Sequence, residues 1–355
     1  MLASFPSLLL NLGLVPLCTA STYKFDRNHV GVAFGPYTKQ WEANDTIPEW
    51  SSYTLQQLEC QLTLISSKFT YIATYNFGTR DSITSHIPTV TASMNKAANK
   101  KLLSIAQGIH QLADPTSQLA EVTSAFQGAQ AANAIFPNTV WALTVNWEDI
   151  FSVQEGIKVS QMINTIKSHP EFQASNLKIG ARTQNCETAL DPNNQHADIV
   201  AILTQLVRDS DYLMCNLYPD YTTSMQSVES AVNSVSNTYS KLNDMVKSVN
   251  PKCDLIVGET GWPSEGVAFN GSPSTVSNMA KFWELVGQKA ATHGVKVVMF
   301  EAIDEPWKSD RRNRDPRDAN GFNGGEGHYG WWVQRNNSDS CSFFEKATGL
   351  TVKIV

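Results

Sequence analysis

The sequence predicts an α/β fold, a single (β/α)8 TIM barrel. Short apolar, β-branched segments recur along the chain, and stretches with helical patterning separate them. Continuous apolar strands that alternate with helices are typical of a parallel sheet covered by helices, and eight such units close a barrel. The expected strands are residues 30–34, 69–75, 102–106, 140–145, 177–179, 212–217, 255–257 and 295–300.

Helical patterning occupies most of the intervals between these strands. The expected helices are residues 54–66, 117–133, 159–167, 197–208, 227–249 and 275–291. A doubly wound open sheet is the alternative arrangement, but no GxGxxG string follows an early strand. We therefore expect one barrel domain over residues 21–355, with a late exposed loop at residues 313–330 that is rich in Gly, Asn, Asp and Arg.

The composition is that of a globular protein with few charges. Hydrophobic residues make up 42% of the chain and charged residues 17%, and the formal net charge is −6 at pH 7. No run of Lys or Arg indicates a nucleic-acid surface, so we expect no nucleic-acid partner. The nine Trp residues are compatible with sugar binding because pyranose rings stack on aromatic faces, although Trp more commonly packs in the core.

Residues 1–20 resemble a secretory signal peptide. An apolar stretch from Leu8 to Leu17 precedes small residues that end at Ala20. The alternative is that this segment is a buried first part of the fold. The stretch is too short to cross a bilayer, and no later segment reaches the about 18 apolar residues that a spanning helix needs. We expect a secreted or cell-wall location, no membrane partner and a monomer.

Five cysteines remain after the expected cleavage, so at least one thiol is unpaired or intermolecular. The spacing does not determine the disulfide pairing, and no Cys or His pattern indicates a metal site. We expect no cofactor. Three N-x-S/T sequons, at Asn44, Asn270 and Asn336, are compatible with a secreted glycoprotein.

The ends of the expected strands carry carboxylates, hydroxyls and aromatic rings. In a barrel, the loops after the C-terminal ends of the strands build the functional site. These residues should therefore converge on one rim. The candidate site residues are Tyr37, Tyr75, Asn146, Trp147, Glu148, Tyr218, Glu259, Trp262, Glu305 and Lys308.

Glu148 and Glu259 together match the requirement of glycoside cleavage. One carboxyl must protonate the leaving oxygen, and the other must attack the anomeric carbon or activate a water. The two residues follow the expected fourth and seventh strands, so they can face each other across a sugar. The alternative for Glu148 is a structural carboxylate at a helix start.

Several strings resemble family motifs. GETGWPS at residues 258–264, NLYP at 216–219 and EAIDEPWK at 301–308 resemble the motifs of glycoside hydrolase family 17, the β-1,3-glucanases, and the last string resembles its fungal branch. Residues 31–37 and 327–330 are also similar to family segments. The resemblance covers essentially the whole mature chain.

The resemblance implies a retaining double-displacement mechanism on β-1,3-glucan. It implies that Glu259 is the nucleophile and Glu148 the acid/base, and that Tyr218 lies near the nucleophile. It further implies that Glu305 and Lys308 support the site, the alternatives being a surface ion pair for these two and plain packing for Tyr218. A sugar hydroxyl in place of water at the second step would give transglycosylation.

Two positions depart from the family pattern. The family has Asn directly before the acid/base, where it contacts the sugar 2-hydroxyl, but Trp147 stands there and the nearest Asn is Asn146. The family also has Arg on strand two, whereas Ala73 occupies that place. Loss of that cation would weaken the hold on an ionised Glu259 unless another rim residue replaces it.

Three functional hypotheses follow. The first is an active β-1,3-glucan hydrolase or glucanosyltransferase. The second, motivated by the two departures, is a catalytically weakened cell-wall glucan-binding protein on the same barrel. The third is hydrolysis of another β-linkage. The choice between endo and exo action depends on loop shapes that the sequence does not define.

Overall fold

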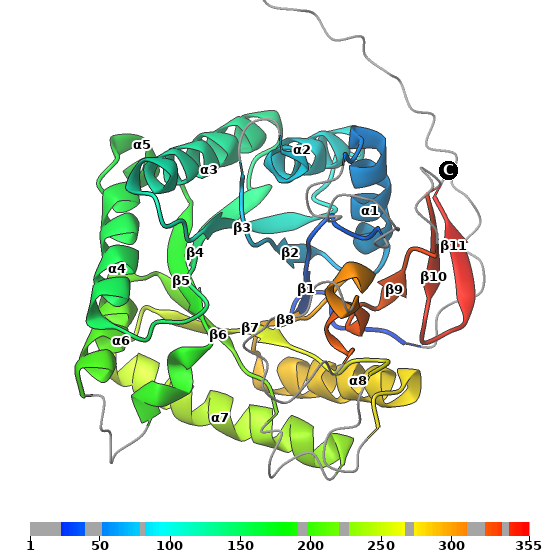
Figure 1. Ribbon diagram of the computed structural model, residues 1–355. Coiled ribbons are helices and arrows are strands. Elements are labelled where there is room, and N and C mark those ends of the chain that lie inside the picture. The colour runs from blue at the N-terminus through cyan, green and yellow to red at the C-terminus, as the bar shows by residue number, and fades with distance from the viewer. Residues whose placement is uncertain are drawn as a thin grey trace, which may run out of the picture.

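The chain folds into a closed barrel of eight parallel strands in sequential order, surrounded by helices (Figure 1). A computed structural model describes residues 23–39, 52–78, 82–190, 197–219, 227–266, 273–310, 324–335 and 341–354. The (β/α)8 prediction is confirmed. The strands are β1 (Val30–Ala33), β2 (Tyr71–Ala73), β3 (Ser104–His110), β4 (Val140–Asn146), β5 (Lys178–Thr183), β6 (Tyr212–Asn216), β7 (Asp254–Thr260) and β8 (Val297–Met299).

The helices form a ring outside the strands (Figure 1). They are α1 (Leu55–Lys68), α2 (Ile87–Ala97), α3 (Pro115–Ile135), α4 (Val153–Lys167), α5 (Pro170–Gln173), α6 (Ala197–Asp209), α7 (Val228–Val249) and α8 (Val276–His293). The six expected helices are present. Helix α2 was not predicted, because its first turns are rich in β-branched residues that have low helix propensity.

Helix ends follow local signals in the sequence. Thr54 and Gln57 form a capping box at the start of α1, and Ser152 and Glu155 form another at the start of α4. Helix α8 ends at Gly294, whose φ of +66° is readily adopted only by a residue without a Cβ. These caps fix where each helix begins or ends relative to the strand beside it.

Side chains along each strand point alternately to the outside and to the inside of the barrel, and so form two cores. One lies between the strands and the helices, and the other fills the barrel interior. Tyrosine hydroxyls inside the barrel are satisfied, since Tyr71 donates to the Val297 carbonyl and Tyr212 to the Leu143 carbonyl, both at 2.7 Å. The interior hydrophobic residues are Ala33, Tyr71, Ala73, Ala106, Ala142, Tyr212, Met214, Ile256, Val298, Phe300 and Tyr329.

A small antiparallel sheet that the sequence did not predict packs beside α1 and β1 (Figure 1). A disulfide between Cys60 of α1 and Cys341 fastens it to the barrel across 281 residues of sequence. Its strands are β9 (Trp332–Val333), β10 (Ser342–Glu345) and β11 (Leu350–Lys353).

Two ion pairs add to this attachment. Lys68 at the end of α1 contacts Glu345 at 2.6 Å. Lys346, which follows β10, is buried and contacts Asp304 at 2.8 Å, and Asp304 in turn accepts the Gly330 backbone N–H at 2.7 Å. The sheet therefore braces the segment that follows β8.

The structure shows the disulfide pairing that the sequence left open. Cys186 and Cys215 form a second disulfide, and Cys253 is a buried free thiol. The expected signal peptide at residues 1–20 and the three sequons lie outside the described residues, as does most of the expected loop at 313–330. Within the described ranges, no helix has the length and apolar character needed to cross a membrane.

Candidate active site

Glu259 lies at the C-terminal end of β7, where a register shift pairs it with Asn216 of β6. Its side chain is nearly buried, with 8% of the residue exposed. Arg182 donates from Nη2 to Glu259 Oε1 at 2.5 Å, and the Tyr218 hydroxyl donates to Oε2 at 3.0 Å. Both carboxylate oxygens are therefore engaged by donors, one of them cationic.

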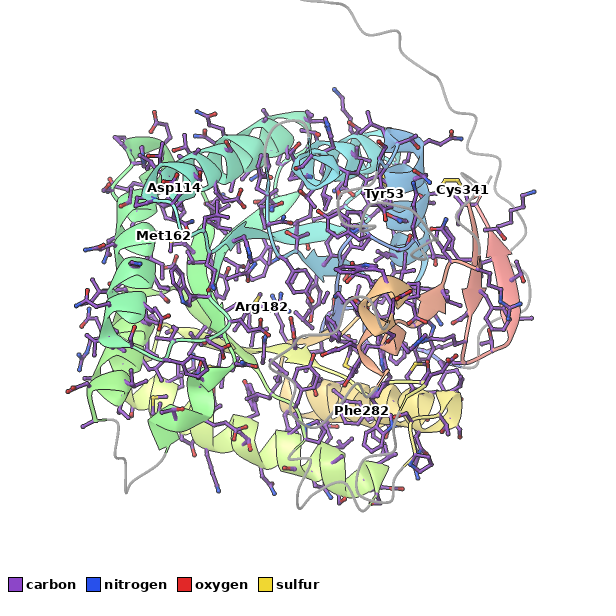
Figure 2. All side chains as sticks on the ribbon, viewed as in Figure 1. Tyr53, Asp114, Met162, Arg182, Phe282 and Cys341 are labelled. Carbon is purple, nitrogen blue, oxygen red and sulfur yellow. A yellow bond between two sulfur atoms is a disulfide. The ribbon has the colours of Figure 1, made fainter. Side chains whose placement is uncertain are left out.

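Arg182 reaches Glu259 from β5 and lies in the middle of the barrel (Figure 2). Only 3% of it is exposed, its Nε donates to Asn216 Oδ1 at 3.2 Å, and its guanidinium lies 4.8 Å from the Tyr75 ring centre. Burial opposes the charge of Arg182, but the neighbouring carboxylate of Glu259 outweighs it, so the pKa of Arg182 is raised. Arg182 supplies the cation that is missing at Ala73.

Glu148 follows β4 and is exposed on the same rim. The surrounding protein removes part of its water, and this desolvation raises the pKa of the Glu148 carboxyl. The negative charges of Glu259 and Asp149 raise it further, while Arg182 opposes the shift. A raised pKa is what a carboxyl needs to hold a proton as a general acid.

The capping of α4 argues against a structural role for Glu148. The helix begins after Ser152, whose side chain accepts from the Glu155 backbone N–H, and Glu155 returns a bond to the Ser152 backbone. The cap is therefore complete without Glu148. The backbone carbonyl of Glu148 accepts from the Gln184 N–H at 2.9 Å, which ties the loop after β4 to the loop after β5.

Glu305 and Lys308 lie in the turn η4 (Pro306–Ser309) and its N-cap, after β8. The Lys308 ammonium contacts Glu305 and lies 3.8 Å from Glu301. Glu305 is 2% exposed, so the alternative of a surface ion pair is wrong for it. Burial, partly offset by Lys308 and reinforced by Glu305, holds the pKa of Glu301 well above its usual range.

The close approach of the segment after β1 to Glu305 explains the glycine at position 35. A Cβ on Gly35 would lie 2.9 Å from Glu305 Oε1. A side chain at position 35 would press on the Glu305 carboxylate that Lys308 contacts. Tyr37, two residues later, packs edge-on against Tyr53 with ring centres 5.9 Å apart. Substrate binding by Tyr37 stays a prediction.

Asn146 at the end of β4 and Tyr75 just after β2 carry polar atoms that lack a hydrogen-bond partner in the described part of the chain. Asn146 Nδ2 donates to the backbone carbonyls of Tyr75 and, at 3.2 Å, Thr74. The Asn146 Oδ1 and the Tyr75 hydroxyl are buried and have no hydrogen-bond partner among the residues that the structure describes. Buried polar atoms are normally satisfied, so these two are candidates to bond a ligand or water.

Two of the predicted substrate contacts lie in the packed outer core. Trp262 is 0% exposed, packs against Phe282 of α8, and donates from Nε1 to the Pro273 carbonyl at 3.3 Å. Trp147 is 7% exposed in the outer core, with the Lys158 ammonium of α4 6.0 Å from its ring centre. Both side chains therefore pack against the surrounding helices.

Glu326 joins the site, and sequence reasoning missed it. It opens the turn η6 (Glu326–His328), and desolvation raises its pKa, as does the charge of Glu259, while Lys308 opposes the shift. Its charge in turn helps to raise the pKa of Glu148. The available signal was an acidic residue within the glycine-rich string GGEGHYG, directly before a family-like segment.

The described residues contain no group of three or more His, Cys, Asp or Glu side chains arranged to hold a metal ion. The site consists of carboxyls on a barrel rim, one of them held by a cation and a second with a raised pKa. This fold and this arrangement define a glycoside hydrolase. The chain belongs to the BtgE/BtgC glycoside hydrolase domain family, whose model matches residues 31–330.

Similar proteins agree with this assignment. A glucan 1,3-beta-glucosidase of Saccharomyces cerevisiae is 29% identical over 143 residues, which are 39% of this chain and 42% of the relative. The match thus spans about two fifths of that relative. The predicted resemblance to glycoside hydrolase family 17 is confirmed.

Solved structures share the fold. An endo-laminarinase from Formosa Hel1_33_131 aligns with a TM-score of 0.64 at 18% identity, over 86% of this chain and 83% of that one. A family 17 β-1,3-glucanosyltransferase from Rhizomucor miehei aligns with a TM-score of 0.60 at 18% identity, over 88% and 96%. An active-site mutant of the latter enzyme has been solved with laminaritriose.

Proposed function

We propose that the chain is a retaining glycoside hydrolase or glucanosyltransferase that acts on β-1,3-glucan. The observation that carries the proposal is the engagement of both Glu259 carboxylate oxygens by Arg182 and Tyr218 on the rim that also bears Glu148. The substrate class is suggested by the names of the similar proteins, which are a glucan 1,3-beta-glucosidase, a laminarinase and a β-1,3-glucanosyltransferase.

In the first step, Glu259 would attack the anomeric carbon while Glu148 protonates the departing oxygen. Arg182 and Tyr218 bond the two oxygens of the attacking carboxylate and fix its orientation. The raised pKa of Glu148 keeps its proton available. Glu259 is thus positioned to attack, and Glu148 is the proton donor.

In the second step, the same charges would let Glu148 act as a base. Once the glycosyl-enzyme ester forms, Glu259 carries no negative charge and no longer raises the pKa of Glu148. The positive charge of Arg182, which lowers that pKa, remains. Glu148 therefore becomes more acidic and acts as base toward an incoming water or sugar hydroxyl.

Sugar contacts would come from polar atoms near the nucleophile that lack a hydrogen-bond partner in the described chain. Asn146 Oδ1 and the Tyr75 hydroxyl lack partners within the described chain and can bond sugar hydroxyls. Hydrogen bonds to the sugar 2-hydroxyl strengthen in the transition state of such reactions. Asn146 is the polar side chain that ends β4, so it is the candidate for that contact.

A secreted or cell-wall location is part of the proposal. The two disulfides are typical of proteins that fold in an oxidising compartment. The alternative of a weakened glucan-binding protein loses most of its motivation, because Arg182 supplies the cation absent at Ala73 and Trp147 is a packing residue.

The test is product analysis of the purified chain on laminari-oligosaccharides. The wild type should give shorter products that are initially β-anomeric, and longer products would reveal transfer. Glu259→Gln should lose at least about 10³-fold in turnover while still binding glucan. Glu284→Gln, an exposed residue of α8 with the same chemical change, should behave as wild type. Absence of products at any protein concentration would sink the catalytic proposal and favour glucan binding.

A further inference from the structure

A cavity of about 660 Å³ lies at the end of the barrel opposite Glu259. It opens between α7 and α8, beneath the N-terminal ends of the later strands. Barrel enzymes build their catalytic sites at the other end, so the proposed reaction does not use this cavity. Its size falls within the roughly 300–1,000 Å³ of small-molecule sites.

The inner wall of the cavity is apolar. Val232 and Val235 project from α7, Val286 and Ala290 from α8, and Val257 from β7. All five are buried core residues. Little of these five side chains is exposed, so the accessible apolar surface comes mainly from the half-buried rings of Trp141 and Tyr239, which also line the cavity.

The cavity also carries an excess of positive charge. Four lysines line it, Lys178, Lys247, Lys289 and Lys296, against two aspartates, Asp244 and Asp254. This positive lining occurs in a chain whose formal net charge is −6.

One aspartate serves two of the lysines. Asp254 contacts Lys178 at 3.2 Å and Lys247 at 3.4 Å. Neither Lys289 nor Lys296 forms an ion pair with any residue that the structure describes. The unpaired cations are therefore the ones available to a ligand.

Lys296 is an exposed cation that lies beside an aromatic ring of the cavity. Its ammonium lies 5.0 Å from the centre of the Trp141 ring, at the start of β8. Partial burial lowers the pKa of Lys296, and the positive charges of Lys178 and Lys101 lower it further, while Asp254 opposes the shift. An anion beside Lys296 would relieve both the desolvation and the repulsion, which a neutral sugar would not do.

We propose that this cavity binds a small organic anion, with its carboxylate or phosphate group at Lys296 and its apolar part against the rings of Trp141 and Tyr239. The site is separate from the rim that bears Glu259 and Glu148 and independent of the reaction proposed there. The mixture of an apolar wall and an unpaired cation selects amphipathic anions over simple inorganic ones.

Isothermal titration calorimetry with phenyl phosphate at low ionic strength tests the proposal. The wild type should bind one equivalent, more tightly than it binds inorganic phosphate. Lys296→Gln should weaken the affinity at least fivefold. Lys241→Gln, an exposed residue of α7 outside the cavity with the same change of charge, should leave the affinity unchanged.

A second variant locates the bound molecule. Ser236→Trp places a large ring in the cavity and should abolish binding, with circular dichroism as the check on folding. The proposal is overturned if phenyl phosphate does not bind, or if Lys296→Gln binds it as tightly as wild type. Displacement of phenyl phosphate by laminaribiose would also overturn it and would make the cavity a sugar site.

Discussion

Replacing Arg182 by Met removes the positive partner of a buried ion pair and leaves the Glu259 carboxylate without its cation. The pair joins side chains that are 3% and 10% exposed at 2.5 Å. Breaking such a pair from one side costs about 3–5 kcal/mol, because the remaining charge stays buried. The Met side chain keeps part of the packing over Tyr75, so we expect the free energy of unfolding to fall by about 4 kcal/mol.

The same loss should appear in catalysis. If about 3 kcal/mol of the effect falls on the transition state, kcat/KM on laminari-oligosaccharides drops about 10²-fold, since 1.36 kcal/mol is a factor of ten. Urea unfolding followed by Trp fluorescence measures the stability. Arg208→Met, at an exposed position on α6, is the matched control and should change stability by less than about 0.5 kcal/mol.

A double variant separates the ion pair from packing. Arg182→Met combined with Glu259→Gln removes both charges, so no uncompensated charge stays buried. We expect the double variant to lose at least about 2 kcal/mol less free energy of unfolding than the two single variants lose in sum. A double variant that is as unstable as that sum, or an Arg182→Met protein that loses less than about 1 kcal/mol, would refute the role assigned to this pair.

Three further predictions concern the surroundings of the site. Glu326→Gln removes a charge that raises the pKa of Glu148, so the alkaline limb of the kcat/KM profile should move to lower pH. Because Glu326 is exposed and its charge is screened, the shift should be less than about one pH unit. A shift to higher pH would contradict the assignment. Cys60→Ser opens the disulfide to the small sheet and should lower the free energy of unfolding by about 2–5 kcal/mol, measured in urea under non-reducing conditions; equal stability would show that the ion pairs suffice. Gly35→Ala brings a methyl 2.9 Å from a Glu305 oxygen and should lower kcat/KM by up to about 10² with little change in circular dichroism, whereas unchanged kinetics would show that this carboxylate can shift freely.

The barrel could be predicted because its strands are buried on both faces and therefore appear as continuous apolar runs. All eight runs became strands. The small sheet at the C-terminus could not be predicted in this way. Its strands are two to four residues long, and β11 (Leu350–Lys353) is mostly exposed, so neither an apolar run nor a clear alternation marks them.

The site was predicted best where a residue follows an inward-facing position of a strand. Glu259 and Tyr218 were found in contact, as the motifs implied. Trp147 and Trp262 lie in the outer core, since neighbouring residues at a strand end point to opposite sides of the barrel wall. A motif records which residues are adjacent in sequence, and it does not record which of them face the cleft.

Arg182 was missed because the family pattern directs attention to strand two, although KIGART at residues 178–183 places a cation inside a short, buried strand. In a closed barrel, inward side chains from any strand meet near the axis, so a cation for Glu259 need not come from one particular strand. Ala73 and Ala106 are small interior residues on β2 and β3, and Tyr75 lies against the guanidinium that crosses the barrel. An Arg at position 73 would compete with Arg182 for the same carboxylate and bury a second charge. The alanine on strand two and the arginine on strand five are therefore two parts of one arrangement, in which the cation has a different origin and the nucleophile keeps its partner.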